Sequence, residues 1–136
     1  MCSSDLDAIG SRIGITLGMN FVAMVLVFWI AVKFGVESAL RGGRYENSIK
    51  QLSLLSYAMP SFYLALLLVL LFGLKLAWFP ISGLEGFEPR EGFAHAIDLA
   101  YHLVLPISVM VFVGFGSLLL YIRSLTVDIQ IGRAHV

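Results

Sequence analysis

Residues 64–72 read LALLLVLLF, nine apolar residues in succession. They lie in a longer apolar stretch, residues 54–79, in which Lys75 is the only charged residue. A helix needs about 20 mostly apolar residues to cross a hydrocarbon core of roughly 30 Å, and only a helix or a closed barrel satisfies its backbone polar groups there. The run lacks the alternation of a barrel strand, so it predicts a helix that crosses a membrane.

Two further stretches have the length and composition of membrane-spanning helices. Residues 13–36 carry one charge, Lys33, near their end, and residues 99–122 contain no Asp, Glu, Lys or Arg. A lysine near the end of a span can extend to the headgroups, so neither Lys33 nor Lys75 interrupts its span. The sequence therefore predicts an all-α integral membrane protein with three transmembrane helices, at about residues 13–36, 54–79 and 99–122.

The composition of the 136-residue chain agrees with this fold class, because 59% of the residues are hydrophobic and 13% are charged. The formal net charge is zero, so no basic excess is present to bind a nucleic-acid backbone. The single cysteine, Cys2, cannot form an internal disulfide or a metal site by itself. The sequence has no phosphate-binding glycine loop, no paired histidines at helical spacing and no nucleophile elbow. We therefore expect no catalytic residues, no cofactor and no metal.

The distribution of basic residues predicts the orientation of the spans. The connection between the first two spans, residues 37–51, contains three Lys or Arg residues, whereas residues 80–98 contain one. Cytoplasmic loops are enriched in Lys and Arg, so the first connection is predicted to be cytoplasmic and the second to lie outside. Arg123 directly follows the third span and agrees with a return to the cytoplasm.

A few residues within the spans have special roles in this interpretation. The amide of Asn20 must find a partner on another helix or line an aqueous path, and we favour contact between helices over contact with a solute. Pro60 and Pro106 shape the second and third spans, because each either kinks its helix or marks the first helical turn. His102, at the mouth of the third span, is expected to be a solvated anchor rather than a proton relay.

Small residues repeat near the start of the first span. Gly10, Gly14 and Gly18 recur at four-residue spacing, which places them on one helix face and can permit the close approach of another helix. Glycine is frequent in membrane helices generally, so the repeat is a weak indication of a helix contact.

Four stretches, in order and spacing, resemble the B-type permease subunits of bacterial dipeptide and oligopeptide ABC importers. SYAMPSFYLALLLVLLF, residues 56–72, resembles the Pro-Ser-Phe opening of one of the family's spans, and LAWFPISG, residues 76–83, resembles the exit of that span. HLVLPISV, residues 102–109, resembles the Leu-Pro start of the next span. IRSLTVDIQ, residues 122–130, resembles the run that leads into the family's cytoplasmic coupling loop.

This resemblance implies a permease subunit of an ATP-driven, binding-protein-dependent importer of peptides or related solutes in the bacterial cytoplasmic (inner) membrane. The three spans would be the second, third and fourth of the six spans of a type-1 ABC permease. The implied partners are a second permease subunit, two cytoplasmic ATPase subunits that hydrolyse ATP, an extracytoplasmic substrate-binding protein and the surrounding lipid bilayer. The family's coupling motif, expected soon after Gln130, does not follow.

Within this framework the solute pathway needs adaptable apolar and amide contacts rather than a fixed charge. Four residues are candidates for its wall: Asn20, Tyr57, Met59 and Phe62. Arg123 and Asp128 belong to the predicted lead-in to the coupling loop. The alternative function is a small structural or assembly membrane subunit without a pathway of its own, which fits the spans but does not account for the four ordered stretches. A proton- or ion-coupled transporter would need an ionisable group near mid-membrane, and no span has one.

The two ends of the sequence are predicted to be foreign to the rest. Residues 1–6, MCSSDL, and residues 131–136, IGRAHV, can be encoded by reverse-complementary DNA that resembles a sequencing adapter. Coincidence between two short peptides is the alternative. On this hypothesis residues 7–130 are an internal piece of an ABC transmembrane type-1 permease domain, and the residues outside that range carry no function.

Overall fold

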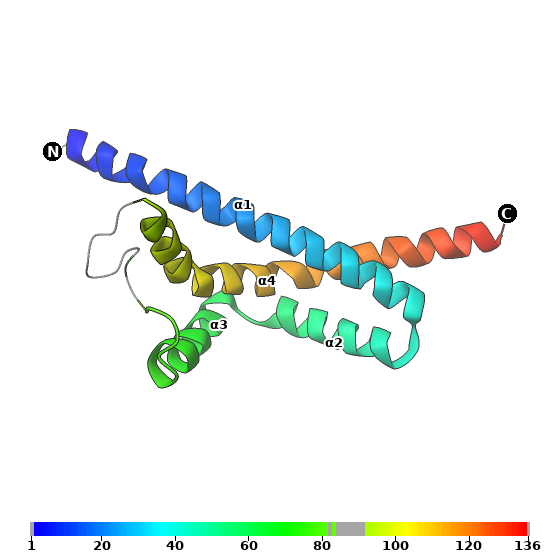
Figure 1. Cartoon of the computed structure of the whole chain (residues 1–136). Coiled ribbons are helices and arrows are strands. Elements are labelled where there is room, and N and C mark those ends of the chain that lie inside the picture. Colours follow the sequence, from blue (N-terminus) through cyan, green and yellow to red (C-terminus); the bar gives the residue numbers. More distant parts are fainter. Residues whose placement is uncertain (1, 82, 84–91, 136) are drawn as a thin grey trace.

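The computed structural model describes residues 2–81, 83 and 92–135, and all regular structure within these ranges is helical (Figure 1). Residues 82 and 84–91 of the predicted outer connection, residues 80–98, therefore lie outside the described residues. Five helical segments follow one another: α1 (Cys2–Arg41), α2 (Gly43–Ala58), α3 (Ser61–Leu68), the π-helical segment η1 (Val69–Lys75) and α4 (Phe93–Ala134).

Helices α1 and α4 are each long and apolar enough to cross a membrane. They contain 40 and 42 residues and extend beyond the predicted spans, residues 13–36 and 99–122, at both ends. At about 1.5 Å per residue each helix is about 60 Å long, roughly twice the thickness of the hydrocarbon core. The two helices pack side by side and cross, as Figure 1 shows. The structure thus confirms both predicted spans as parts of longer helices.

The middle stretch is bent rather than continuous. Helix α2 and the pair α3–η1 meet at an angle of 100°, and together they are apolar and long enough to count as a third candidate span. Met59 and Pro60 are extended between them, with ψ of 123° and 132°. This corrects the predicted helix over residues 54–79, which breaks at Met59–Pro60 and ends at Lys75. The reason is Pro60, which has no N–H to donate and disfavours the α conformation in the preceding residue.

Pro60 and Pro106 have different roles in their helices. Pro60 directly precedes α3, which agrees with the helix-start alternative. Pro106 lies in the interior of α4, where it cannot donate the hydrogen bond to the carbonyl of His102. In Figure 1 the first turns of α4, in olive, run at an angle to the rest of the helix, which agrees with the kink alternative for Pro106.

The end of η1 is tied to the beginning of α4 through aromatic residues. The backbone N–H groups of Trp78 and Phe79 both donate to the carbonyl of Phe72, at 2.8 and 3.2 Å, across Ala77, whose φ of 51° lies in the left-handed region. The hydroxyl of Tyr101 donates to the carbonyl of Trp78. The ring of Tyr101 also packs 5.3 Å from that of Phe79. These contacts fix the turn after η1 against α4.

Helix α4 is the common packing partner of the other helices, since α1, α2 and α3 all contact it. A small core of Ala31 from α1 and Phe115 and Leu119 from α4 is buried where the helices meet. On α1, a Cβ at Gly35 would lie 3.1 Å from the backbone oxygen of Leu119, so this glycine lets α1 approach α4 closely.

Helices α2 and α4 approach each other closely at Gly116. A Cβ placed there would lie 2.4 Å from the carbonyl oxygen of Ser53 and 3.0 Å from the Cβ of Ser56. Both serines are fully buried, and the Ser56 hydroxyl donates to the carbonyl of Phe112. Glycine and serine at one contact, with a hydrogen bond between the helices, are typical of packing in membranes.

We predict that Gly116→Ala destabilises the protein by about 1–3 kcal/mol, because the added methyl group overlaps the backbone of α2. The measurement is the free energy of reversible unfolding in detergent micelles. The matched control is Gly14→Ala, where a Cβ meets nothing within 4 Å. The control should be neutral or stabilising by up to about 1 kcal/mol through helix propensity. Equal stabilities of the two variants would contradict the α2–α4 contact.

Candidate functional site

The four predicted pathway residues occupy two places in the structure. Tyr57, Met59 and Phe62 flank the bend between α2 and α3, where Met59 is half-buried and the other two side chains are each 70% exposed. Asn20 lies on α1 and is exposed. Its amide nitrogen donates to the backbone oxygen of Thr16 at 2.7 Å, so this hydrogen bond stays within its own helix. None of the four lines the cavities described below, and their role in a pathway stays a prediction.

A polar face runs along α1 through Asn20. Arg12, Thr16 and Asn20 follow one another at four-residue spacing, which places their side chains on one side of the helix. The Thr16 hydroxyl donates to the backbone oxygen of Arg12 at 3.1 Å, and all three side chains are exposed. Polar side chains in a membrane span are costly against lipid and usually face other helices or water. The face therefore needs a polar environment in the membrane.

The N-terminal part of this face opens on a crevice between α1 and the kinked part of α4. We call this site the Arg12 crevice; it has a volume of about 860 Å³. Its lining comes from both helices and from the segment after η1: Ser11, Arg12, Ile15, Thr16, Met19, Gly83, Leu103 and Pro106. The kink at Pro106 thus shapes one wall of the crevice. Among the described residues, α1 supplies its hydroxyl and charged groups.

A second cavity, of about 490 Å³, shares Met19, Gly83 and Pro106 with the Arg12 crevice and continues toward α3. His102 lines it, and the Nδ1 atom of this residue lies 2.8 Å from the backbone oxygen of Asp98. The structure therefore places His102 in a cavity wall, with one ring nitrogen held by its own helix.

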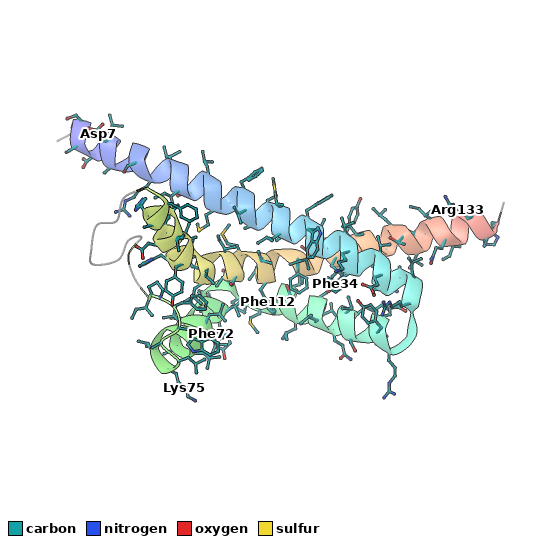
Figure 2. The ribbon with its side chains drawn as sticks, viewed as in Figure 1. Asp7, Phe34, Phe72, Lys75, Phe112 and Arg133 are labelled. Atoms are coloured by element: carbon teal, nitrogen blue, oxygen red, sulfur yellow. The ribbon has the colours of Figure 1, made fainter. Side chains whose placement is uncertain are left out.

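An apolar groove lies between α1, α2 and α4 and has a volume of about 450 Å³. Figure 2 shows Phe34 and Phe112, which line it, near the centre of the molecule. Ser108 is its one lining residue with a polar side chain, and this hydroxyl donates to the backbone oxygen of Val104 at 2.7 Å. The groove thus offers apolar contact and little to orient a polar ligand.

At the opposite end of the bundle, an ion cluster joins α2 to α4. The guanidinium of Arg123 donates to the carboxylate of Glu46, and the Lys50 ammonium lies 2.7 Å from the same oxygen. Glu46 and Arg123 lie outside the predicted spans, and hydrogen bonds from Lys50 and Arg123 lower the pKa of the Glu46 carboxyl. Arg123 therefore holds two helices together, while Asp128, further along α4, is exposed.

In the described ranges, no three His, Cys, Asp or Glu side chains lie close enough together to hold a metal ion. The arrangement instead offers surfaces for contact along the membrane: a polar face, two connected cavities and an apolar groove.

Comparison with known proteins relates this arrangement to solute transport. The chain is 30% identical over 124 residues to the oligopeptide transport system permease protein AppB of Bacillus subtilis, an alignment that covers 90% of this chain and 38% of the relative. It is 32% identical over 111 residues to the di/tripeptide transport system permease protein DppB of Pseudomonas aeruginosa, covering 70% of this chain and 33% of the relative. The chain is a homologue of bacterial peptide transport permeases.

A third permease relative broadens the range of named solutes. The peptidoglycan transport system permease protein YejB of Agrobacterium fabrum is 26% identical over 139 residues, covering 98% of this chain and 38% of the relative. No protein-family model matches the chain. The chain spans little more than a third of the length of these relatives. Like these permeases, it is a multi-pass membrane protein.

Sequence reasoning missed two features of this permease homologue. The pair Glu46–Arg123 joins residues 77 positions apart, and its only sequence signal is an acidic residue within a basic connection. Arg12 was also overlooked, although a basic residue at the predicted outer end of a span runs against the usual cytoplasmic bias. The predicted orientation, used together with that bias, could have drawn attention to Arg12.

We predict that the charge-reversed variant Glu46→Arg unfolds at a lower temperature than the wild type, because it places three cations together at the α2–α4 contact. Adding Arg123→Glu should recover much of the loss by restoring an opposite-charge pair. The measurement is the thermal unfolding midpoint in micelles of an uncharged detergent. A double variant no more stable than the single one would show that the two charges do not interact across the helices.

Proposed function

We propose that the chain forms part of the permease subunit of an ATP-driven, binding-protein-dependent importer of peptides or related solutes. The observation that carries this proposal is the similarity to permeases named for oligopeptide, di/tripeptide and peptidoglycan transport, which extends over most of the chain. The three named solute classes share peptide chemistry, which is why peptides are the proposed substrates.

The proposed assembly contains a second permease subunit, two cytoplasmic ATPase subunits and an extracytoplasmic substrate-binding protein in the bacterial inner membrane. The permease itself would supply walls for the solute path and no chemistry, with ATP hydrolysed by the separate subunits. The four ordered stretches that resemble B-type permeases support this assembly, including residues 122–130, which resemble the run before a coupling loop.

The polar face of α1 supports a role in the pathway. Arg12, Thr16 and Asn20 precede the part of α1 that packs in the core of Ala31, Phe115 and Leu119, and all three are exposed. In a transporter such a face is stable against water in the pathway or against a polar partner helix. A peptide carries amide groups that exchange hydrogen bonds with hydroxyl and amide side chains.

The test is a chimera in which residues 7–130 replace the aligned segment of the B. subtilis oligopeptide permease, in a strain that lacks that permease. We predict that the chimera restores uptake of a radiolabelled oligopeptide and that uptake stops when the partner ATPase is inactivated. The control is the same chimera with Gly116→Leu, which should fail to pack. A chimera that reaches the membrane in normal amount but gives no uptake would favour the structural or assembly alternative.

The same chimera tests the wall residues. We predict that Asn20→Leu and Met59→Leu each lower the initial rate of oligopeptide uptake without lowering the amount of permease in the membrane. Leu17→Met, on the exposed surface of α1, is the matched control and should leave the rate unchanged. Uptake retained by both test variants would remove Asn20 and Met59 from the pathway wall.

A further inference from the structure

We propose that the Arg12 crevice is a binding site for the carboxylate end of a short peptide, with Arg12 as the residue that binds the carboxylate. This inference rests on the proposed transport of peptides. It adds that the crevice binds the C-terminal end of the peptide and not its N-terminal end.

Arg12 lies at an unusual position for a basic residue. The predicted orientation places the beginning of α1 outside, whereas Lys and Arg beside membrane spans are normally concentrated on the cytoplasmic side. Arg12 is exposed and makes no ion pair with any residue in the described part of the chain. Its five N–H donors are therefore available at the edge of the crevice.

The hydroxyl groups beside Arg12 complement it. Ser11 donates to the backbone oxygen of Ala8 at 2.9 Å, and Thr16 donates to the backbone oxygen of Arg12 at 3.1 Å. Because each hydroxyl has one proton, both are left as acceptors toward the crevice. The wall thus offers a guanidinium for a carboxylate and hydroxyl oxygens for N–H groups, which are the polar groups found together at the C-terminal end of a peptide.

The size and charge of the crevice restrict the ligand further. Its volume of about 860 Å³ lies within the range of roughly 300–1,000 Å³ that is usual for small-ligand sites. Ile15, Met19 and Leu103 form apolar walls for a side chain, and methionine adapts to different shapes. None of the described residues that line the crevice is acidic. A carboxylate is therefore favoured over an ammonium group, and the guanidinium can bind it with two parallel hydrogen bonds.

The experiment uses the full chain in nanodiscs of phosphatidylcholine, a lipid without net charge. The probe is the tripeptide Ala-Ala-Phe labelled with a fluorophore at its N-terminus, with either a free C-terminal carboxylate or a C-terminal amide. Fluorescence anisotropy gives the Kd of each form. We predict that the carboxylate form binds on the order of tenfold more tightly, as a charge-assisted contact with arginine requires.

Two variants test whether Arg12 causes the difference in Kd between the carboxylate and amide forms. Arg12→Gln should make the Kd values of the two peptide forms equal, while Arg44→Gln, an exposed arginine at the start of α2, should leave the tenfold preference intact. Equal Kd values for the two peptide forms in the wild type would by themselves overturn the inference. An equal loss of the carboxylate preference in Arg12→Gln and Arg44→Gln would also overturn it.

A lipid phosphate is the other source of an anionic group at a membrane surface. Repeating the titration in nanodiscs that contain phosphatidylglycerol distinguishes the two sources. The inference predicts that the carboxylate preference persists, and its disappearance would assign the crevice to lipid headgroups. The binding experiment and the chimera can fail independently. If the chimera takes up peptide but the carboxylate and amide probes have equal Kd values, only the carboxylate site is removed. If the chimera is inactive but binding of the carboxylate probe depends on Arg12, only the transport proposal is removed.

Discussion

Close approach of helix backbones at α4 is the constraint on which the rest of the structure depends. Lipid tails are as apolar as leucine, so burying apolar side chains does little to join helices within a bilayer, and packing and hydrogen bonds must do so. Gly116 brings the backbone of α2 against α4, and Gly35 does the same for α1. Leu119, which lies beside both contacts, is almost fully buried. Helix α4 thereby fixes α1 and α2 relative to each other.

Other features follow from this arrangement. With α2 held by Ser53 and Ser56, the extended residues Met59 and Pro60 turn the chain by 100° into α3. The ion cluster around Glu46 lies beyond the glycine contact and joins the same two helices, so α2 is attached to α4 at two points. The kink of α4 at Pro106 then gives the Arg12 crevice one of its walls. The packed end and the open end of the bundle are thus on opposite sides of the α4 core.

Much of the fold could be predicted from the sequence because continuous apolar runs report directly on length across a bilayer. The helices over residues 13–36 and 99–122 were predicted for this reason. The break at Met59–Pro60 was less accessible, since a proline in an apolar run is compatible with either a kink or a helix start. Close contacts were the hardest to predict: the repeat Gly10, Gly14 and Gly18 meets nothing within 4 Å, whereas Gly35 and Gly116 belong to no repeat. Which glycines lie at helix contacts therefore depends on tertiary packing and not on their spacing in the sequence.

The candidate site was predictable only in part. Asn20 was found by its polarity within a span, whereas the crevice around Arg12 depends on how α1 lies against α4.

The most direct test of the central claim, that α1 and α4 meet in the membrane at glycine contacts, is oxidative cross-linking of paired cysteines in isolated membranes. A Cβ at Gly35 would lie 3.3 Å from the Cβ of Ile122, close to the separation of about 3.5–4.5 Å in disulfides. In a Cys2→Ser background, Gly35→Cys with Ile122→Cys should form an intramolecular disulfide readily. Gly35→Cys with Tyr121→Cys should not, because Tyr121 is exposed. Equal cross-linking of the two pairs, or none in either, would contradict the packing on which this account depends.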